Sequence, residues 1–174
     1  TAAVGVGMEQ AAAATGALYT EFTGFNQVSE TTQKELIGTT ATLEQVGVAA
    51  SLTAESINFL TKGLGMSATE AAATQEQLAE FAKGIGVTPA LMAENFKASQ
   101  PIMVQYGSVV GQQVFEKLSK QAKATGIAFS DLLSITGQFD TFEGAANAAG
   151  KLNALLGGNL LNSVELLTAD FNQD

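Results

Sequence analysis

The fold is decided by residues 4–50, which read VGVGMEQAAAATGALYTEFTGFNQVSETTQKELIGTTATLEQVGVAA. Within this stretch, apolar, small and hydroxyl residues recur in alternating steps of three and four, a period typical of a helix that buries one seam against another. The seam predicts a long coiled-coil-like helix from about residue 6 to about residue 49, loosened near Gly24 and Gly38. Hydroxyls interrupt it, so we expect loose packing. The seam positions are Val4, Met8, Ala11, Thr15, Leu18, Phe22, Phe25, Ser29, Thr32, Leu36, Thr39, Leu43, Val46 and Ala50.

The length of this helix favours association between chains. A helix of about forty residues reaches roughly 60 Å, which exceeds a compact domain of this size. The alternative is that the same seam packs onto later helices of its own chain. The residues expected at the interface between copies are Leu18, Phe22, Phe25, Leu36, Leu43 and Val46.

Three later junctions share the order Lys, small residue, any residue, Gly, aliphatic residue. Their glycines, Gly65, Gly86 and Gly126, predict helix ends, because Gly adopts positive φ without strain and the next aliphatic residue can fold back onto the last turn. The Lys of each junction faces the negative end of the helix dipole. We expect a fourth helix stop at Gly158.

The remaining chain is predicted to form short helices joined by Gly-capped turns. Thr88 before Pro89, for example, suits an N-cap followed by the first helical position. The chain is therefore expected to be all-α, with a long helix over residues 1–50 and a short-helix region over residues 51–174. The short helices are expected near residues 53–63, 68–84, 89–98, 101–124, 129–136, 141–156 and 162–170.

One of these segments, residues 101–124, begins ambiguously. Residues 102–106 resemble a short strand, but the apolar pattern continues at helical spacing with Val109, Val110, Val114 and Leu118. The pattern as a whole therefore predicts a single helix.

The composition argues against most chemistries. All eight basic residues are Lys, so the 174-residue chain has no Arg, and it also lacks His and Cys. A zinc site has neither thiolate nor imidazole ligands, and nucleophile–base catalysis has only carboxylates or Lys as partners. The formal net charge of −9 opposes binding to a phosphate backbone. We expect no enzyme, no metal or other cofactor, and no specific nucleic-acid binding.

The ends of the chain and its hydropathy suggest a segment of a longer polypeptide without a membrane span. The sequence begins at Thr1 rather than Met, and no basic region followed by an apolar run marks a signal peptide. The most apolar stretch, residues 152–167, is interrupted by Asn and Gly and is too short and too polar to cross a bilayer.

Residues 137–167 carry a resemblance to a known family. This stretch reads GQFDTFEGAANAAGKLNALLGGNLLNSVELL. It is similar to a segment of tail tape measure and related tail structural proteins of long-tailed phages, especially aquatic ones. The most specific part runs from Lys151 to Leu156 and continues with Gly-Gly-Asn and Leu-Asn-Ser. Elsewhere the chain matches only in style, being rich in Ala, Gly and Thr.

The resemblance implies a long helical protein that fills the tail lumen, sets the tail length and is anchored at the tail tip by its C-terminal part. This chain would then be a non-enzymatic virion component near the tip, with other tail-tip and hub proteins as partners. Because tail tips have threefold or sixfold symmetry, the resemblance also implies a homotrimer.

Two other functions stay open. A membrane-active, pore-forming protein often has Ala/Gly-rich amphipathic helices, although the acidic charge and the lack of a basic face oppose this function. A coiled-coil secretion or signalling module needs a longer uninterrupted heptad array than residues 126–158 permit.

Overall fold

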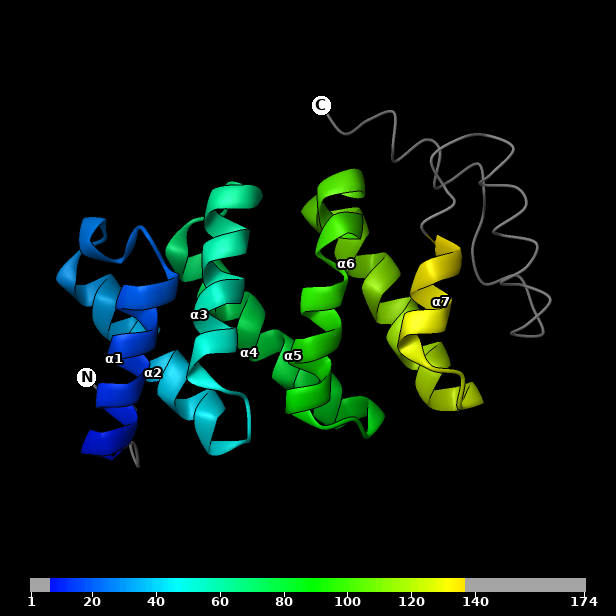
Figure 1. Cartoon of the computed structure of the whole chain (residues 1–174), viewed down its shortest axis with the longest axis horizontal. Coiled ribbons are helices and arrows are strands. Elements are labelled where there is room, and N and C mark those ends of the chain that lie inside the picture. Colours follow the sequence, from blue (N-terminus) through cyan, green and yellow to red (C-terminus); the bar gives the residue numbers. More distant parts are fainter. Residues whose placement is uncertain (1–6, 137–174) are drawn as a thin grey trace. The chain divides into compact units, whose positions relative to one another are not determined.

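A computed structural model describes residues 7–136, and every regular element in this part of the chain is helical (Figure 1). The all-α prediction is therefore confirmed for these residues. The predicted helices at 141–156 and 162–170 lie outside the described residues. The elements are α1 (Met8–Glu21), η1 (Phe25–Gln27), α2 (Glu30–Gln45), α3 (Ala50–Asn58), η2 (Phe59–Gly63), α4 (Ala68–Ile85), α5 (Pro89–Ala98), α6 (Gln100–Thr125) and α7 (Phe129–Thr136).

The predicted long N-terminal helix is wrong, because the chain leaves the helical conformation twice within it. α1 ends at Phe22, whose backbone is extended at φ −108° and ψ 101°. α2 begins after Ser29, whose hydroxyl accepts a 3.1 Å hydrogen bond from the Thr32 N–H and so caps the new helix. A second break follows at Gly47, where φ is +98°. The loosening expected near Gly24 therefore falls in a true break, whereas Gly38 lies inside α2.

The chain forms two compact units, Thr1–Lys97 and Ala98–Asp174. The boundary expected after residue 50 is therefore wrong. It would separate α1 and α2 from α3 and α4, which pack closely against them. The seam folds back on its own chain, so that the first four helices share one core. Residue 50 therefore lies inside the first unit and not at its boundary.

Helices α1 to α4 of the first unit alternate in direction along the chain. The Thr23 N–H donates a 3.2 Å hydrogen bond to Asn58 Oδ1, which joins the C-terminal ends of α1 and α3 and shows that they run in parallel. Gln45 Nε2 at the end of α2 donates a 2.9 Å bond to Gln10 Oε1 at the start of α1, so these two helices are antiparallel. Figure 1 shows α1 and α3 side by side.

One cluster in the core of the first unit is built from small and aliphatic residues. Leu43, Val48, Ala79 and Ala93 form one buried cluster, with Leu52 packed against it. These residues come from α2, the turn after it, α4, α5 and α3. Because Ala adds little bulk, the helix backbones approach closely, and α5 is held in this unit through Ala93.

The described part of the second unit consists of α6 and α7. The Phe115 and Phe129 rings pack edge to face with centroids 5.5 Å apart, which attaches α7 to α6. The predicted single helix at 101–124 is interrupted. Gly107 has φ +83° and ψ 166°, so α6 comprises two helical segments (Figure 1).

Candidate functional site

The residues expected at an interface between copies lie mostly inside the first unit. Leu18, Phe22, Phe25, Leu36 and Leu43 are each at most 5% exposed in the single chain, whereas Val46 is 38% exposed. The intrachain alternative accounts for this burial, because the break after α1 turns α2 back and closes the seam on itself. Five of the six side chains are thus already covered without a second copy, and the seam no longer supports self-association.

An aromatic cluster occupies the break between α1 and α2. The Tyr19 and Phe25 rings pack edge to face with centroids 4.7 Å apart, and Phe22 lies 6.5 Å from Phe25 in a similar arrangement. Such pairs add to the stabilisation that burial already provides. Phe22 and Phe25 therefore anchor the reversal of the chain rather than a contact between copies.

The predicted helix-stop glycines have the expected conformation wherever the structure describes them. Gly65, Gly86 and Gly126 have φ of +75°, +76° and +76°. At Gly86 the next residue, Val87, donates a 2.8 Å backbone hydrogen bond to the Ala82 carbonyl, as in a Schellman motif. Gly158 lies outside the described residues.

Gly47 is a further helix stop that the sequence reasoning missed. The Val48 N–H donates a 3.0 Å bond to the Leu43 carbonyl, the same arrangement as at Gly86. The signal that could have identified it is a glycine followed by an aliphatic residue. The preceding Lys that marks the other three junctions is absent here, because Glu44 occupies the last turn.

An open groove with several polar groups in its lining lies between α2 and α4, and we call it the α2–α4 groove. It has a volume of about 350 Å³. Its lining combines small residues, Gly38, Ala72 and Ala73, with the polar residues Glu35, Thr39 and Glu76. Nothing in the sequence reasoning pointed to this groove.

Hydroxyl groups on the two helices of the groove pair with carboxylates across it. Thr39 Oγ1 of α2 donates a 2.7 Å hydrogen bond to Glu76 Oε1 of α4, and Thr69 Oγ1 of α4 donates a 3.3 Å bond to Glu35 Oε2 of α2. The residue nearer the start of α2, Glu35, is bonded to the residue nearer the start of α4, Thr69, and the later residues Thr39 and Glu76 are bonded to each other. The two helices α2 and α4 therefore run in parallel. These bonds tie the helices together and set their register.

The groove offers no evident reaction chemistry. Its carboxylates are bonded by neutral hydroxyls, and its one cationic residue, Lys34, forms a 3.3 Å ion pair with Glu30 at the surface. Within residues 7–136 no three acidic side chains come together in a way that could hold a metal ion. The groove is therefore best described as an open surface between two helices, lined by small and polar residues.

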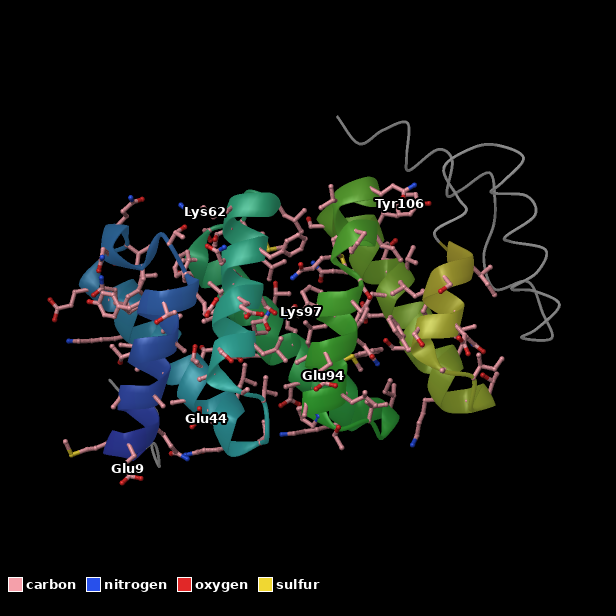
Figure 2. The ribbon with its side chains drawn as sticks, in the orientation of Figure 1. Glu9, Glu44, Lys62, Glu94, Lys97 and Tyr106 are labelled. Carbon is pink, nitrogen blue, oxygen red and sulfur yellow. The ribbon has the colours of Figure 1, made fainter. Side chains whose placement is uncertain are left out.

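An ion pair joins α3 to α5 at the end of the first unit. Lys97 Nζ, labelled in Figure 2, donates a 2.9 Å hydrogen bond to Glu55 Oε2. This bond and the charge of Glu55 raise the pKa of Lys97 above its ordinary value, and the charge of Glu21 acts in the same direction. Because both side chains are partly open to solvent, salt screens the pair.

Comparison with known proteins gave no match to any family, curated protein or solved structure. Among the described helices, none is long and apolar enough to cross a membrane. A function for this chain must therefore be inferred from its residues, from their packing and from the resemblance of residues 137–167.

Proposed function

We propose that this chain is a non-enzymatic helical scaffold within a tail tape measure protein, seated in the tail lumen near the tip of a long-tailed phage. The observation that carries the proposal is the similarity of residues 137–167 to proteins of that family. The tail-tip and hub proteins would be its partners, and the chain would contribute to tail length and tip assembly.

The use of polar side chains in the first unit supports a scaffolding role. The Ser29 and Ser67 hydroxyls cap helices, and the hydroxyls of Thr39 and Thr69 tie α2 to α4. The chain also lacks Arg, His and Cys. These residues build and register helices, which is what a structural protein requires.

The charge of the chain suits a lumen that later carries DNA. With a formal net charge of −9 and no Arg, the chain repels phosphate groups. A protein that leaves the tail ahead of the genome benefits from this repulsion. We therefore propose no nucleic-acid partner.

In this proposal, a threefold arrangement of the chain is set by the tail tip and not by self-association of the seam. Since the seam is buried within one chain, we expect the isolated chain to sediment as a monomer at tens of micromolar. A threefold arrangement in the tail would then be imposed by the tip proteins, each copy docking through surface such as the α2–α4 groove.

Tail length in mutant phage tests this function. An in-frame deletion of the codons for residues 8–45 removes the α1–α2 hairpin. A tape measure predicts shorter tails: by about 57 Å if these residues open into one helix in the tail, and by about 24 Å, the length of α2, if the hairpin persists, at about 1.5 Å per residue. The matched control duplicates the same codons and should lengthen the tail by the same amount. Electron microscopy measures both.

Mass spectrometry of purified virions supplies the second readout. Peptides of this chain should be present at a few copies per tail and should crosslink to tip proteins. Absence of these peptides from gradient-purified virions would overturn the proposal, as would tails whose length follows neither the deletion nor the duplication and whose tips show no crosslinks.

A further inference from the structure

The bend in α6 depends on a single residue. The backbone of Gly107, at φ +83° and ψ 166°, lies in a region that essentially only Gly adopts. Residues 100–106 and 108–125 on either side are helical, and Tyr106, the last residue before the bend, is labelled in Figure 2. No other residue of α6 departs from helical geometry.

A close contact between the two segments keeps the bend sharp. A Cβ atom built on Gly111 would lie 2.7 Å from Met103 Sδ and 2.9 Å from Met103 Cα. In a straight helix, residues eight apart are separated by about 12 Å along the axis. The second segment therefore folds back against the first, and only a glycine at position 111 leaves room for it.

The apolar pattern of the same residues is that of a straight helix. Ile102, Tyr106, Val110, Val114 and Leu118 are spaced four apart and continue across Gly107 without a shift. If Gly107 became helical, these residues would form one continuous inclined row on the helix. In the bent form Ile102, Tyr106, Val114 and Leu118 are buried.

The bent form leaves apolar surface uncovered on both sides of the bend. Val104 is 61% exposed in the first segment, and Val109 is 70% exposed in the second. Met103, in contrast, is fully buried.

We propose that α6 is a two-state element that opens at Gly107 into one continuous helix of 26 residues. This inference does not rest on the proposed function. Opening separates Met103 from Gly111 and uncovers Met103, so the bent form prevails in the free chain. Any contact that covers the apolar side chains exposed by opening shifts the population toward the open helix.

The distance between the two ends of α6 distinguishes the states. Because the chain has no Cys, Gln100→Cys and Lys123→Cys give two specific sites for spin labels in the full chain. Their Cα atoms would be about 35 Å apart in a straight helix and roughly 20 Å apart in the bent one. Pulsed electron paramagnetic resonance reads both populations.

Two glycine substitutions should open the helix by independent routes. Gly107→Ala places a side chain where φ is positive and favours the helical state, so we expect the open population to rise about tenfold or more relative to the bent one. Gly111→Ala adds a Cβ atom that would clash with Met103 in the bent form, so the open population should rise in this variant as well. The control is Gly84→Ala in α4, where a Cβ meets nothing within 4 Å; the distance distribution should not change.

The result that supports the proposal is a mainly short distance in the parent chain and a larger long-distance population in both α6 variants. A short distance alone in both variants, with helical circular dichroism retained, would overturn it. Loss of the helical signal in both would overturn it as well, because the open helix would then not be a stable state.

Discussion

The reversal between α1 and α2 and the reversal within α6 are built differently, although the apolar spacing continues through both. Between α1 and α2 the chain leaves the helix over several residues, with Phe22 and Phe25 buried beneath it and Ser29 capping the next helix. Within α6 the reversal takes one residue, Gly107, and one close contact. The first reversal is fixed by burial and capping, whereas the second depends on the conformational freedom of glycine. Hydrophobic spacing is thus compatible with either a rod or a hairpin.

Removing an aromatic anchor from the first reversal should have the largest effect. Phe25→Ala empties a buried site and should lower the free energy of unfolding by about 3–5 kcal/mol. Urea denaturation followed by circular dichroism measures the change. Tyr19→Ala, at a residue that is 54% exposed, is the matched control and should cost clearly less. Equal losses in the two variants would mean that Phe25 is not a core anchor.

The helix stop at Gly86 should respond in stability without a change in helix length. Gly86→Val puts a β-branched residue at φ +76° and should destabilise the fold by about 2 kcal/mol. Because Pro89 begins the next helix, α4 and α5 cannot merge, unlike the segments of α6. Thermal denaturation measures the loss of stability, and an unchanged circular dichroism signal would show that α4 and α5 remain separate helices. A neutral substitution would contradict the role of Gly86 as a left-handed helix end.

The cap of α2 should contribute a smaller amount to the first reversal. Ser29→Ala removes the acceptor of the Thr32 N–H and should cost about 1 kcal/mol. Ser67→Ala, which removes the equivalent 3.1 Å cap from the Glu70 N–H of α4, is the matched control and should cost a similar amount. If Ser29→Ala costs nothing, the aromatic residues alone set where α2 begins.

A substitution at Thr40 in helix α2 should stabilise the fold. Thr40 is fully buried and its hydroxyl has no hydrogen-bond partner. Thr40→Val keeps the shape and removes the unsatisfied group, so we expect a gain of about 1 kcal/mol. Chemical denaturation measures it. A loss of similar size would indicate that the hydroxyl is bonded in solution.

Features of the fold that depend on a few adjacent residues were predicted from the sequence. Features that depend on contacts between distant residues were not. The ends of α4 and α6 follow from Gly86 and Gly126, because a helix stop depends on a few adjacent residues. The break after α1 was missed because Phe22 and Phe25 keep the seam spacing on both sides of it, so a folded seam reads like a straight one. Gly107 was missed because one glycine inside a helical pattern costs only about 1 kcal/mol and does not by itself predict a bend.

The α2–α4 groove could not be predicted from the sequence for a different reason. Its cross-helix bonds join residues 34 and 37 positions apart, from Glu35 to Thr69 and from Thr39 to Glu76. Their proximity depends on the parallel register of α2 and α4, which the chain reaches only after it has turned at Gly47 and turned again near Gly65. The groove is therefore a consequence of the way α3 connects the two helices.

The smallest expected effect belongs to the Lys97–Glu55 pair, which joins α5 to the helices that the first reversal assembles. The pKa of Lys97 is raised in the folded chain by its bond to Glu55, so the stabilisation is fully present below the ordinary pKa of Lys and is lost as the pH rises through the higher folded value. Lys97→Met should therefore lower the melting temperature slightly at neutral pH, and its difference from the parent chain should shrink in alkaline solution. Lys34→Met removes the more exposed pair with Glu30 and is the control, with a still smaller effect at neutral pH. A difference between Lys97→Met and the parent chain that stays constant into alkaline solution would show that the methylene stem of Lys97, and not its charge, holds α5 in place.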